Sequence, residues 1–255
     1  MSVQDKPLTV PRASTSDDPV QALGMRLAEL AVQIDGWTRE VVGNRLGPPA
    51  TTLGGVLEYH FGWRDVELEP LPQPAPTGKL LRPALALLVS SAVCGEVLPA
   101  RKAAVAVELV HNFSLVHDDI QDQSDLRRHR PAVWTVWGMP QGINAGDALF
   151  ALAQTTILEQ DSPATLAMAR VLNETCLRLV EGQYLDLDLQ AGRVPLSQAV
   201  YESMIMGKTG ALFECAARLG ALAAGASPAA QAVNARPSSV IFPALARSPA
   251  NGFTQ

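Results

Sequence analysis

Cysteine is scarce in this sequence and follows no pattern. The 255 residues contain three cysteines, Cys94, Cys176 and Cys215, which lie far apart and form no Cys-x-x-Cys or Cys/His grouping. An odd and scattered set does not build a disulfide framework, and it lacks the spacing of a structural zinc site. We therefore expect a protein of a reducing compartment, the cytoplasm.

Positive charge and long apolar runs are also scarce. The chain carries 20 Lys and Arg against 25 Asp and Glu, a net charge of −5 with no basic block. Nucleic-acid binding depends on clustered Lys and Arg, so we expect no nucleic-acid partner. No uncharged apolar run is long enough to cross a bilayer, and the first residues lack the apolar core of a signal peptide. We expect a protein that does not span a membrane.

The sequence lacks the period of two that marks half-buried strands, whereas helical spacing recurs throughout. Its 47% apolar residues suffice for a sizeable core. The pattern predicts an all-α bundle, with 123–139 irregular and with Asn144 and Asp147 capping a helix start. The segment 99–122 is apolar on nearly all faces and is expected at the centre. The predicted helices cover 19–46, 51–62, 80–94, 99–122, 148–160, 164–189 and 196–225.

The end of the predicted central helix carries the most informative motif, Asp-Asp-x-x-Asp. Asp118 and Asp122 lie four residues apart and share one helix face, with His111 on nearly the same stripe. Two carboxylates one turn apart repel each other unless a cation lies between them, and Mg²⁺ bound jointly with a substrate phosphate suits such oxygens. Arg127 and Arg128 follow as forked phosphate donors. Taken alone, each motif is more often a solvated helix end or loop.

A second polyanion site is indicated upstream by Gly78-Lys79-Leu-Leu-Arg82-Pro83. Lys79 and Arg82 are spaced three apart at a predicted helix start, so both fall on one side, and Pro83 fits a first turn. An isolated basic pair at a helix start is more often a surface feature. Lys79 and Arg82 therefore indicate a polyanion site only in combination with the other motifs.

Two later motifs add to the polar set. Gly182 would let another element or a ligand approach closely, and Gln183 and Asp186 project on one side of their helix. A polar outer face is an equal alternative for that pair. Lys208 and Thr209 interrupt a small, apolar stretch, where a lone lysine more often reaches out to solvent.

Together and in this order, these motifs resemble the trans-prenyltransferases, the polyprenyl (isoprenyl) diphosphate synthase family. The resemblance implies an isoprenoid-synthase-type helical bundle around a central cavity, which condenses isopentenyl diphosphate with an allylic prenyl diphosphate and forms a homodimer when complete. Asp119, about 100° round the helix from Asp118, is not assigned as a metal ligand. By motif, the resemblance implies that Asp118 and Asp122 bind Mg²⁺, that Arg127, Lys208 and Thr209 contact the allylic diphosphate, and that Lys79, Arg82, His111 and Arg128 contact isopentenyl diphosphate. It implies catalytic roles for Asp118, Asp122, Arg127 and Lys208. We expect Gln183, from its place beside Gly182, to be a further substrate contact.

The residues before the acidic motif carry the expectation about product length. Phe113 lies five positions before Asp118, an arrangement similar to short-chain synthases that make the twenty-carbon geranylgeranyl diphosphate. Ideal helix geometry places Ser114 directly below Asp118 and Phe113 to one side. We expect a C20 product with Phe113 in contact with the growing chain.

The composition changes after residue 225, where proline recurs too often for a helix. We expect a disordered tail at 1–18, the N-terminal part of a prenyl synthase catalytic domain at 19–225, and an unrelated disordered tail at 226–255. The resemblance implies further helices with a second Asp-rich motif, so we expect a bundle incomplete at its C-terminus and little activity from this chain alone. The alternatives are a non-catalytic binding or regulatory subunit of a heteromeric synthase, and a class I terpene cyclase.

Overall fold

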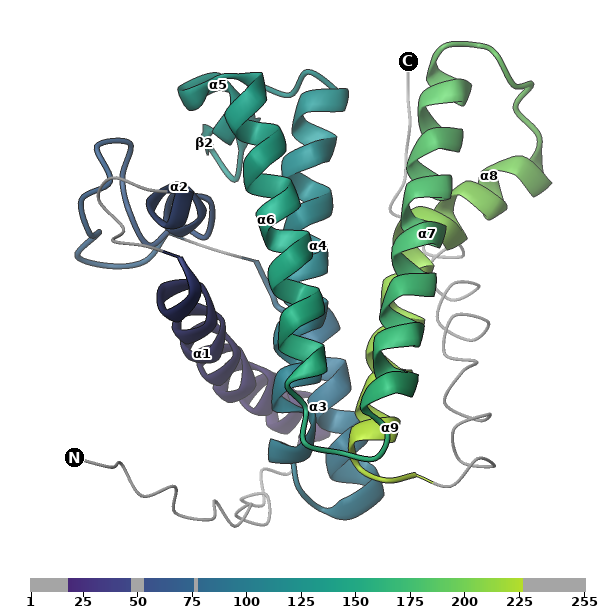
Figure 1. Ribbon diagram of the computed structural model, residues 1–255. Helices are drawn as coiled ribbons and strands as arrows, with labels where there is room; N and C mark the ends of the chain where they lie inside the picture. The colour runs from purple at the N-terminus through teal and green to yellow at the C-terminus, as the bar shows by residue number, and fades with distance from the viewer. Residues whose placement is uncertain (1–17, 47–52, 76–77, 227–255) are drawn as a thin grey trace.

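The computed structural model describes residues 18–46, 53–75 and 78–226, and most of this part of the chain is helical (Figure 1). The predicted all-α bundle is confirmed. The expected tails fall outside the described residues apart from their boundary positions, and their character stays a prediction. The elements are α1 (Pro19–Arg45), α2 (Leu53–His60), α3 (Leu81–Cys94), η2 (Leu98–Ala100), α4 (Arg101–Gln121), β1 (Leu126–Arg127), β2 (Arg130–Pro131), α5 (Val133–Trp137), α6 (Met139–Leu158), α7 (Thr165–Gln190), α8 (Gln198–Ile205), η3 (Met206–Gly210) and α9 (Ala211–Ala223).

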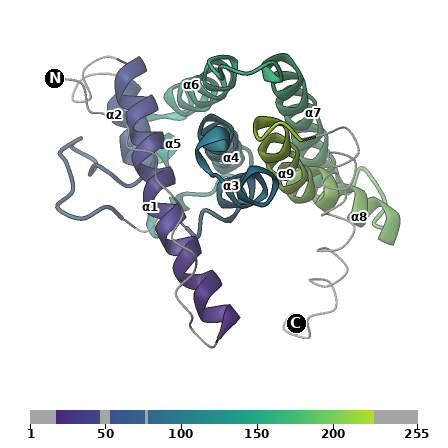
Figure 2. The same ribbon diagram turned by 90° about the horizontal axis from the view of Figure 1, so that it is seen from below.

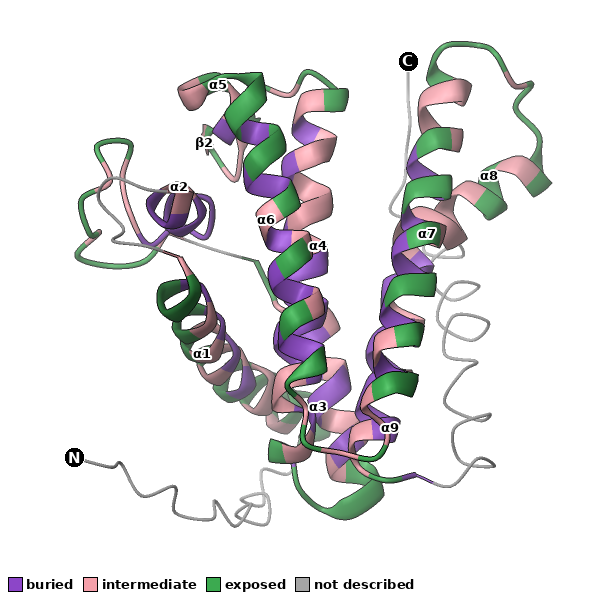
Figure 3. Cartoon of the chain, viewed as in Figure 1, coloured by how far each residue is buried: buried purple, intermediate pink, exposed green. Residues whose placement is uncertain are grey.

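Helix α4 is the centre of the bundle, as its all-round apolarity predicted. Every residue from 103 to 110 is buried, which a helix achieves only when neighbours cover all its faces. Those neighbours include α6, α3, α9 and α1, and the end-on view in Figure 2 shows α4 enclosed among them. Figure 3 shows buried residues along α4, on the inner faces of its neighbours and over most of α2. In the described part of the chain, no helix combines the length and apolarity needed to cross a bilayer.

Helix α3 joins this core through a close backbone contact. A Cβ added to Gly220 of α9 would lie 2.2 Å from the carbonyl oxygen of Ala86, so only glycine allows this approach. The helix ends where the sequence predicted, at Gly95, whose left-handed backbone (φ 84°) lets its N–H donate to the Ser91 carbonyl. It begins one residue later than expected, at Leu81. Lys79 precedes the helix, and the left-handed backbone of Leu80 (φ 47°) interrupts the helical spacing by which Lys79 was expected to share one side with Arg82.

The segment 123–139 was predicted as irregular and is not. Strands β1 and β2 form a short antiparallel hairpin there, followed by α5. Helix α6 then begins at Met139, with Pro140 in its first turn, where the fixed proline φ favours a helix start. Asn144 and Asp147 consequently lie inside α6, and their predicted capping role is wrong. Asn144 instead donates a side-chain hydrogen bond to Gln141 at 3.1 Å.

Candidate active site

Two cavities flank the C-terminal half of α4. The α4–α7 cavity has a volume of about 300 Å³ and is lined by Phe113 and Asp118 from α4, by Gln183 and Leu187 from α7, and by Lys208. The basic cavity, on the side of α3, has a volume of about 330 Å³. Its lining combines four cations with one acid and one imidazole, namely Lys79, Arg82, Arg127, Arg128, Glu108 and His111. Most of the polar residues singled out in the sequence therefore meet at one end of the central helix.

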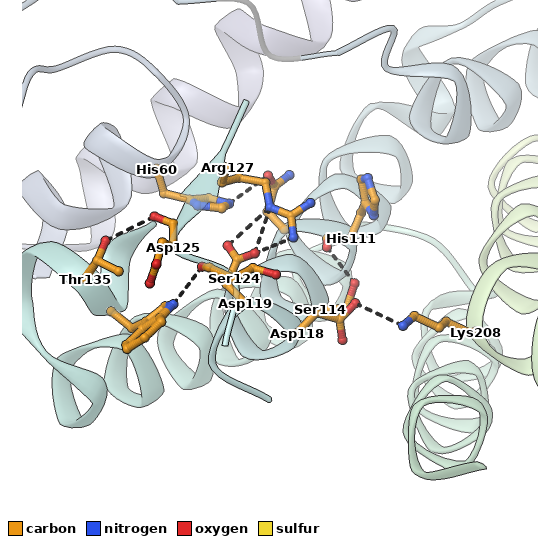
Figure 4. A network of polar contacts seen from close by, with 12 residues as sticks. His60, His111, Ser114, Asp118, Asp119, Ser124, Asp125, Arg127, Thr135 and Lys208 are labelled. Carbon is orange, nitrogen blue, oxygen red and sulfur yellow. Dashed lines mark hydrogen bonds and ion pairs between the residues drawn. The ribbon is translucent and has the colours of Figure 1, made fainter. Parts of the chain in front are cut away.

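Lys208 connects the acidic motif of α4 to α7. Its ammonium donates to Asp186 Oδ2 at 2.6 Å and lies 3.9 Å from Asp118 Oδ2, and Figure 4 shows it pointing toward Asp118. Burial raises the pKa of Asp118 to about 6, and repulsion from Asp122 adds to this, while the charge of Lys208 opposes it. Burial lowers the pKa of Lys208, but the hydrogen bond with Asp186 and the charge of Asp118 outweigh it and leave a raised pKa.

A π-turn places Lys208 and Thr209. The predicted helix over 196–225 is divided into α8, the π-turn η3 and α9, with Lys208 and Thr209 inside the π-turn. Such single turns of wider helix recur at functional sites. The turn rests on Gly182 of α7, where an added Cβ would lie 2.3 Å from the Lys208 backbone nitrogen. The close approach predicted for Gly182 is therefore made by the chain itself.

Gln183 follows Gly182 and turns its amide inward. Its side chain is buried and lines the α4–α7 cavity. Neither amide atom has a hydrogen-bond partner within the described part of the chain. The alternative of a polar outer face is wrong for this residue. A buried amide without partners is costly unless a ligand or water completes it, so this cavity is suited to a polar ligand.

Asp119 and Arg127 form the tightest polar pair at this end of α4. The Arg127 Nε donates to both carboxylate oxygens of Asp119, at 3.0 and 3.2 Å, and Nη2 donates to Oδ1 as well (Figure 4). The Asp119 side chain is only 2% exposed. This hydrogen bonding raises the pKa of Arg127. Asp119 thus holds an arginine at the wall of the basic cavity, and Arg127 does not line the α4–α7 cavity.

The short hairpin presents Arg128 beside Arg127. Arg128 and His129 form its two-residue turn, with φ of 52° and 64°, the positive values that suit tight hairpins. Arg130 anchors the hairpin by donating to the Tyr59 carbonyl at 2.8 Å, and the Tyr59 hydroxyl donates back to the Pro131 carbonyl at 2.8 Å. Burial lowers the pKa of Arg128. This turn was not predictable from the sequence because Asn-Gly or Asp-Gly, the usual residues at such positions, are absent.

Arg82 and His111 meet across the basic cavity. The guanidinium of Arg82 lies over the ring of Phe213, 4.7 Å from its centroid, and Nη1 is 3.5 Å from His111 Nε2. Burial, together with the charges of Arg82 and Arg128, lowers the pKa of His111 to about 3, so the ring is neutral and accepts at Nε2. Arg82 Nε is buried and has no partner among the described residues. An anion entering the cavity would supply one.

The acidic pair fits a shared Mg²⁺ rather than a cage built from protein alone. Asp122 is exposed and caps α4, donating its N–H to the Asp118 carbonyl at 2.8 Å. Over residues 18–46, 53–75 and 78–226, no group of three or more His, Cys, Asp and Glu is placed to hold an ion. Mg²⁺ commonly uses one or two carboxylates and completes its shell with water and substrate phosphate oxygens. Asp118 and Asp122 match that requirement.

Sequence reasoning missed the buried acid of the basic cavity. Glu108 lines the cavity and is only 3% exposed. In the sequence it was treated as one more residue of an apolar helix and was assigned no role. A charged residue within an otherwise apolar run was the available signal. Asp186 was noted only as sharing a face with Gln183, and the structure pairs it with Lys208.

Comparison with known proteins places these features in a family. The polyprenyl synthetase family profile matches residues 68–238. The chain is 37% identical over 212 residues to the (2E,6E)-farnesyl diphosphate synthase of Mycobacterium tuberculosis, covering 82% of this chain and 58% of that protein. It is 43% identical over 152 residues to the geranylgeranyl diphosphate synthase of Methanosarcina mazei, covering 59% of this chain and 47% of that protein.

A solved structure agrees with the sequence comparisons. The polyprenyl synthetase of Streptomyces coelicolor superposes with a TM-score of 0.76 at 36% identity, over 84% of this chain and 61% of that one. The chain thus spans about half to three fifths of the length of the relatives it matches. The family match, the shared helical fold and the acidic and basic motifs together show that the chain belongs to the polyprenyl synthetase family.

Proposed function

We propose that the chain carries the substrate sites of a Mg²⁺-dependent prenyl diphosphate synthase, which joins isopentenyl diphosphate to an allylic prenyl diphosphate. The observation that carries this proposal is the pair of cavities on α4. One presents Asp118 of the acidic motif and a lysine, and the other presents four cations with a buried Arg82 Nε that has no partner among the described residues. The names of the relatives, farnesyl and geranylgeranyl diphosphate synthases, support the same reaction class. A homodimeric assembly and a cytoplasmic location stay predictions.

The basic cavity is assigned to isopentenyl diphosphate. Lys79, Arg82 and Arg128 supply the charge, and the guanidinium groups match phosphate oxygens with paired donors. His111 is neutral because of its lowered pKa, so it does not add a charge and instead accepts from Arg82. This substrate keeps its diphosphate through the reaction, and no metal ligand lines its cavity.

The α4–α7 cavity is assigned to the allylic diphosphate. Lys208 and Gln183 line this cavity and would bind its phosphate oxygens, with Thr209 next to Lys208 in the π-turn, and Asp118 and Asp122 would hold Mg²⁺. When bound, Mg²⁺ neutralises negative charge that develops on the departing diphosphate. Arg127, fixed by Asp119 beside the acidic motif, adds a positive charge to the same end of α4. Phe113, Leu179 and Leu187 form apolar walls that exclude water, which would otherwise quench an allylic cation.

The proposed product is the twenty-carbon geranylgeranyl diphosphate. Phe113 lines the α4–α7 cavity, and its ring meets Phe150 of α6 edge-on at 5.4 Å between centroids, with His117 at 5.3 Å. Ser114, the residue directly below Asp118, also lines the cavity and leaves room for a chain. Relatives named for fifteen-carbon and for twenty-carbon products both match, so the length rests on these side chains.

The test is condensation by the purified protein with Mg²⁺. Labelled isopentenyl diphosphate is supplied with geranyl or farnesyl diphosphate, and the products are separated by chain length. Because little activity is expected from this chain alone, we expect slow, Mg²⁺-dependent formation of a C20 diphosphate, and longer products from Phe113→Ala. Leu126→Ala, at an exposed position of the hairpin, is the matched control and should leave the product unchanged. A released cyclic hydrocarbon would indicate a terpene cyclase, and the absence of any elongated product would contradict the proposal.

A further inference from the structure

A buried chain of three polar side chains runs from α2 to α4 behind the basic cavity. Asn112 donates from Nδ2 to the Glu108 carbonyl at 2.8 Å and to Glu108 Oε1 at 2.6 Å. His60 Nε2 lies 3.1 Å from Asn112 Oδ1. Both amide protons of Asn112 are used toward Glu108, so Oδ1 accepts and His60 donates from Nε2. The chain fixes the orientation of the Glu108 carboxyl.

The other oxygen of this carboxyl is left over. Glu108 Oε2 is buried and has no hydrogen-bond partner within the described residues, and Glu108 lines the basic cavity. Burial raises the pKa of Glu108 to about 7, although the hydrogen bond from Asn112 and the charges of Arg128 and Arg82 oppose this. The carboxyl is therefore divided between its two protonation states near neutral pH.

The two states have opposite effects on an anion. An ionised Glu108 repels a diphosphate and competes with it for Arg82 and Arg128. A protonated Glu108 offers Oε2–H as a donor, and its Oε1 still accepts from Asn112. A bound diphosphate adds negative charge nearby, which favours the protonated state further.

We infer that Glu108 is a diphosphate-binding residue that acts as the neutral acid, so that a diphosphate entering the basic cavity takes up one proton at Oε2 and receives it as a hydrogen bond. This inference rests on the proposed use of the basic cavity. It assigns to the cavity a proton-linked affinity, which falls as pH rises through the titration of the carboxyl. Asn112 and His60 are positioning residues in this arrangement.

The groups facing Glu108 do not produce the same effect. They are Asp35 from α1, His60 from α2, Arg82 from α3, Arg128 from the hairpin, and His111 on α4 itself. The pKa values of His60 and His111 are both lowered to about 3, mainly by burial, so both rings stay neutral from about pH 6 to 9. The arginines stay charged across that range. The ligand also titrates, but its contribution is common to all variants.

The experiment is calorimetric binding of isopentenyl diphosphate, without Mg²⁺, to the wild type and to Glu108→Gln from about pH 6 to 9. Glutamine is the neutral isostere, which keeps an acceptor for Asn112 and a donor for the cavity. The two proteins should bind equally at the low end. Above the carboxyl pKa, the wild type should weaken relative to Glu108→Gln by a factor approaching about tenfold per pH unit. In buffers of different ionisation enthalpy, the wild type should take up protons beyond those of the ligand.

A second variant separates charge from hydrogen bonding. Glu108→Met is neutral but has no donor, so it should bind more weakly than Glu108→Gln at every pH and lack the additional pH dependence of the wild type. Parallel pH dependence of wild type and Glu108→Gln would overturn the inference alone. The inference would also be overturned if the wild type bound the ligand without taking up protons beyond those of the ligand itself. This measurement does not depend on the folding of any variant. Absence of binding by all three proteins would overturn the proposed use of the cavity as well.

Discussion

The two cavities beside α4 hold their charges in different ways. In the α4–α7 cavity the cation is already paired, because Lys208 lies between Asp118 and Asp186. In the basic cavity Arg82 and Arg128 face a single carboxyl, Glu108, whose pKa burial raises to about 7. The first cavity is close to neutral, so a metal ion or an anion that binds there must replace the existing ion pairs of Lys208 with Asp118 and Asp186. The second carries surplus positive charge and is prepared for an anion alone.

The largest effect should come from removing the acid that the neutral cavity depends on. Asp118→Ala removes the proposed metal ligand and one partner of Lys208, so condensation should fall by about a hundredfold or more. Initial rates at saturating Mg²⁺ measure this. Asp125→Ala, an exposed acid in the following segment, is the matched control and should retain activity. Equal rates for Asp118→Ala and the control would break the contrast between the cavities.

The cations of the two cavities should separate the two substrates. Lys208→Ala should raise the KM for the allylic diphosphate about tenfold or more, and Arg82→Ala should do the same for isopentenyl diphosphate, because each loses a charge-assisted contact to one ligand. The two KM values are measured for each variant. Arg170→Ala, an exposed cation on α7, controls for the loss of charge and should change neither. Similar shifts for both substrates in both variants would contradict the division.

The position of Lys208 should be sensitive to a single methyl group. An added Cβ at Gly182 would meet the Lys208 backbone nitrogen at 2.3 Å, so Gly182→Ala should destabilise the fold by about 1–3 kcal/mol and shift Lys208 away from Asp186. Gly36→Ala is the opposite control, since nothing lies within 4 Å of a Cβ there and it should stabilise α1 by about 0.5–1 kcal/mol. Urea unfolding gives both values. If Gly182→Ala did not destabilise the fold, the contact would not be tight. If Gly36→Ala destabilised it as much, the effect would not be specific to this contact.

The buried imidazole behind the basic cavity should make stability fall in acid. Burial lowers the pKa of His60 from 6.5 to about 3, so the folded state binds fewer protons than the unfolded state between these values. The stability from neutral His60 is therefore complete above pH 6.5 and is lost as pH falls toward 3. Urea midpoints at about pH 7 and 5 measure this, and His60→Gln should show a smaller difference than the wild type. An equal difference would mean that His60 titrates freely.

The helices of this bundle were largely predictable because each has a local sequence pattern, either in its apolar residues or in the residues at its ends. Ala and Val on all faces predicted the central place of α4, and Gly95 predicted the end of α3. The start of α6 was missed because Asn144 and Asp147 suit a helix start by composition, whereas Pro140 set it. The hairpin was missed because its turn residues, Arg128 and His129, hold positive φ without the usual asparagine or glycine.

The candidate site was predictable as a set of residues but not as an arrangement. Motif spacing indicated Asp118 and Asp122 as a pair, yet it could not show that Lys208 would lie between Asp118 and Asp186, which is a contact between distant helices. Arg127 and Arg128 are adjacent in sequence, but the hairpin gives them different partners. Glu108 was hidden because the cost of burying an acid is visible only when its surroundings are known.

The π-turn η3 also has a consequence for changes in chain length. A π-turn contains one residue more than the α-helical turn it replaces, so deleting one residue from Met206–Gly210 would restore an ordinary helix. Every residue of α8 would then turn by about 100° about the axis relative to α9. No residue of α8 is buried, so this rotation would change the packing of the core very little. Deletion of a single codon could thus move Lys208 away from the acidic motif while the bundle stays folded. At this turn, a change in chain length would affect ligand binding without preventing folding.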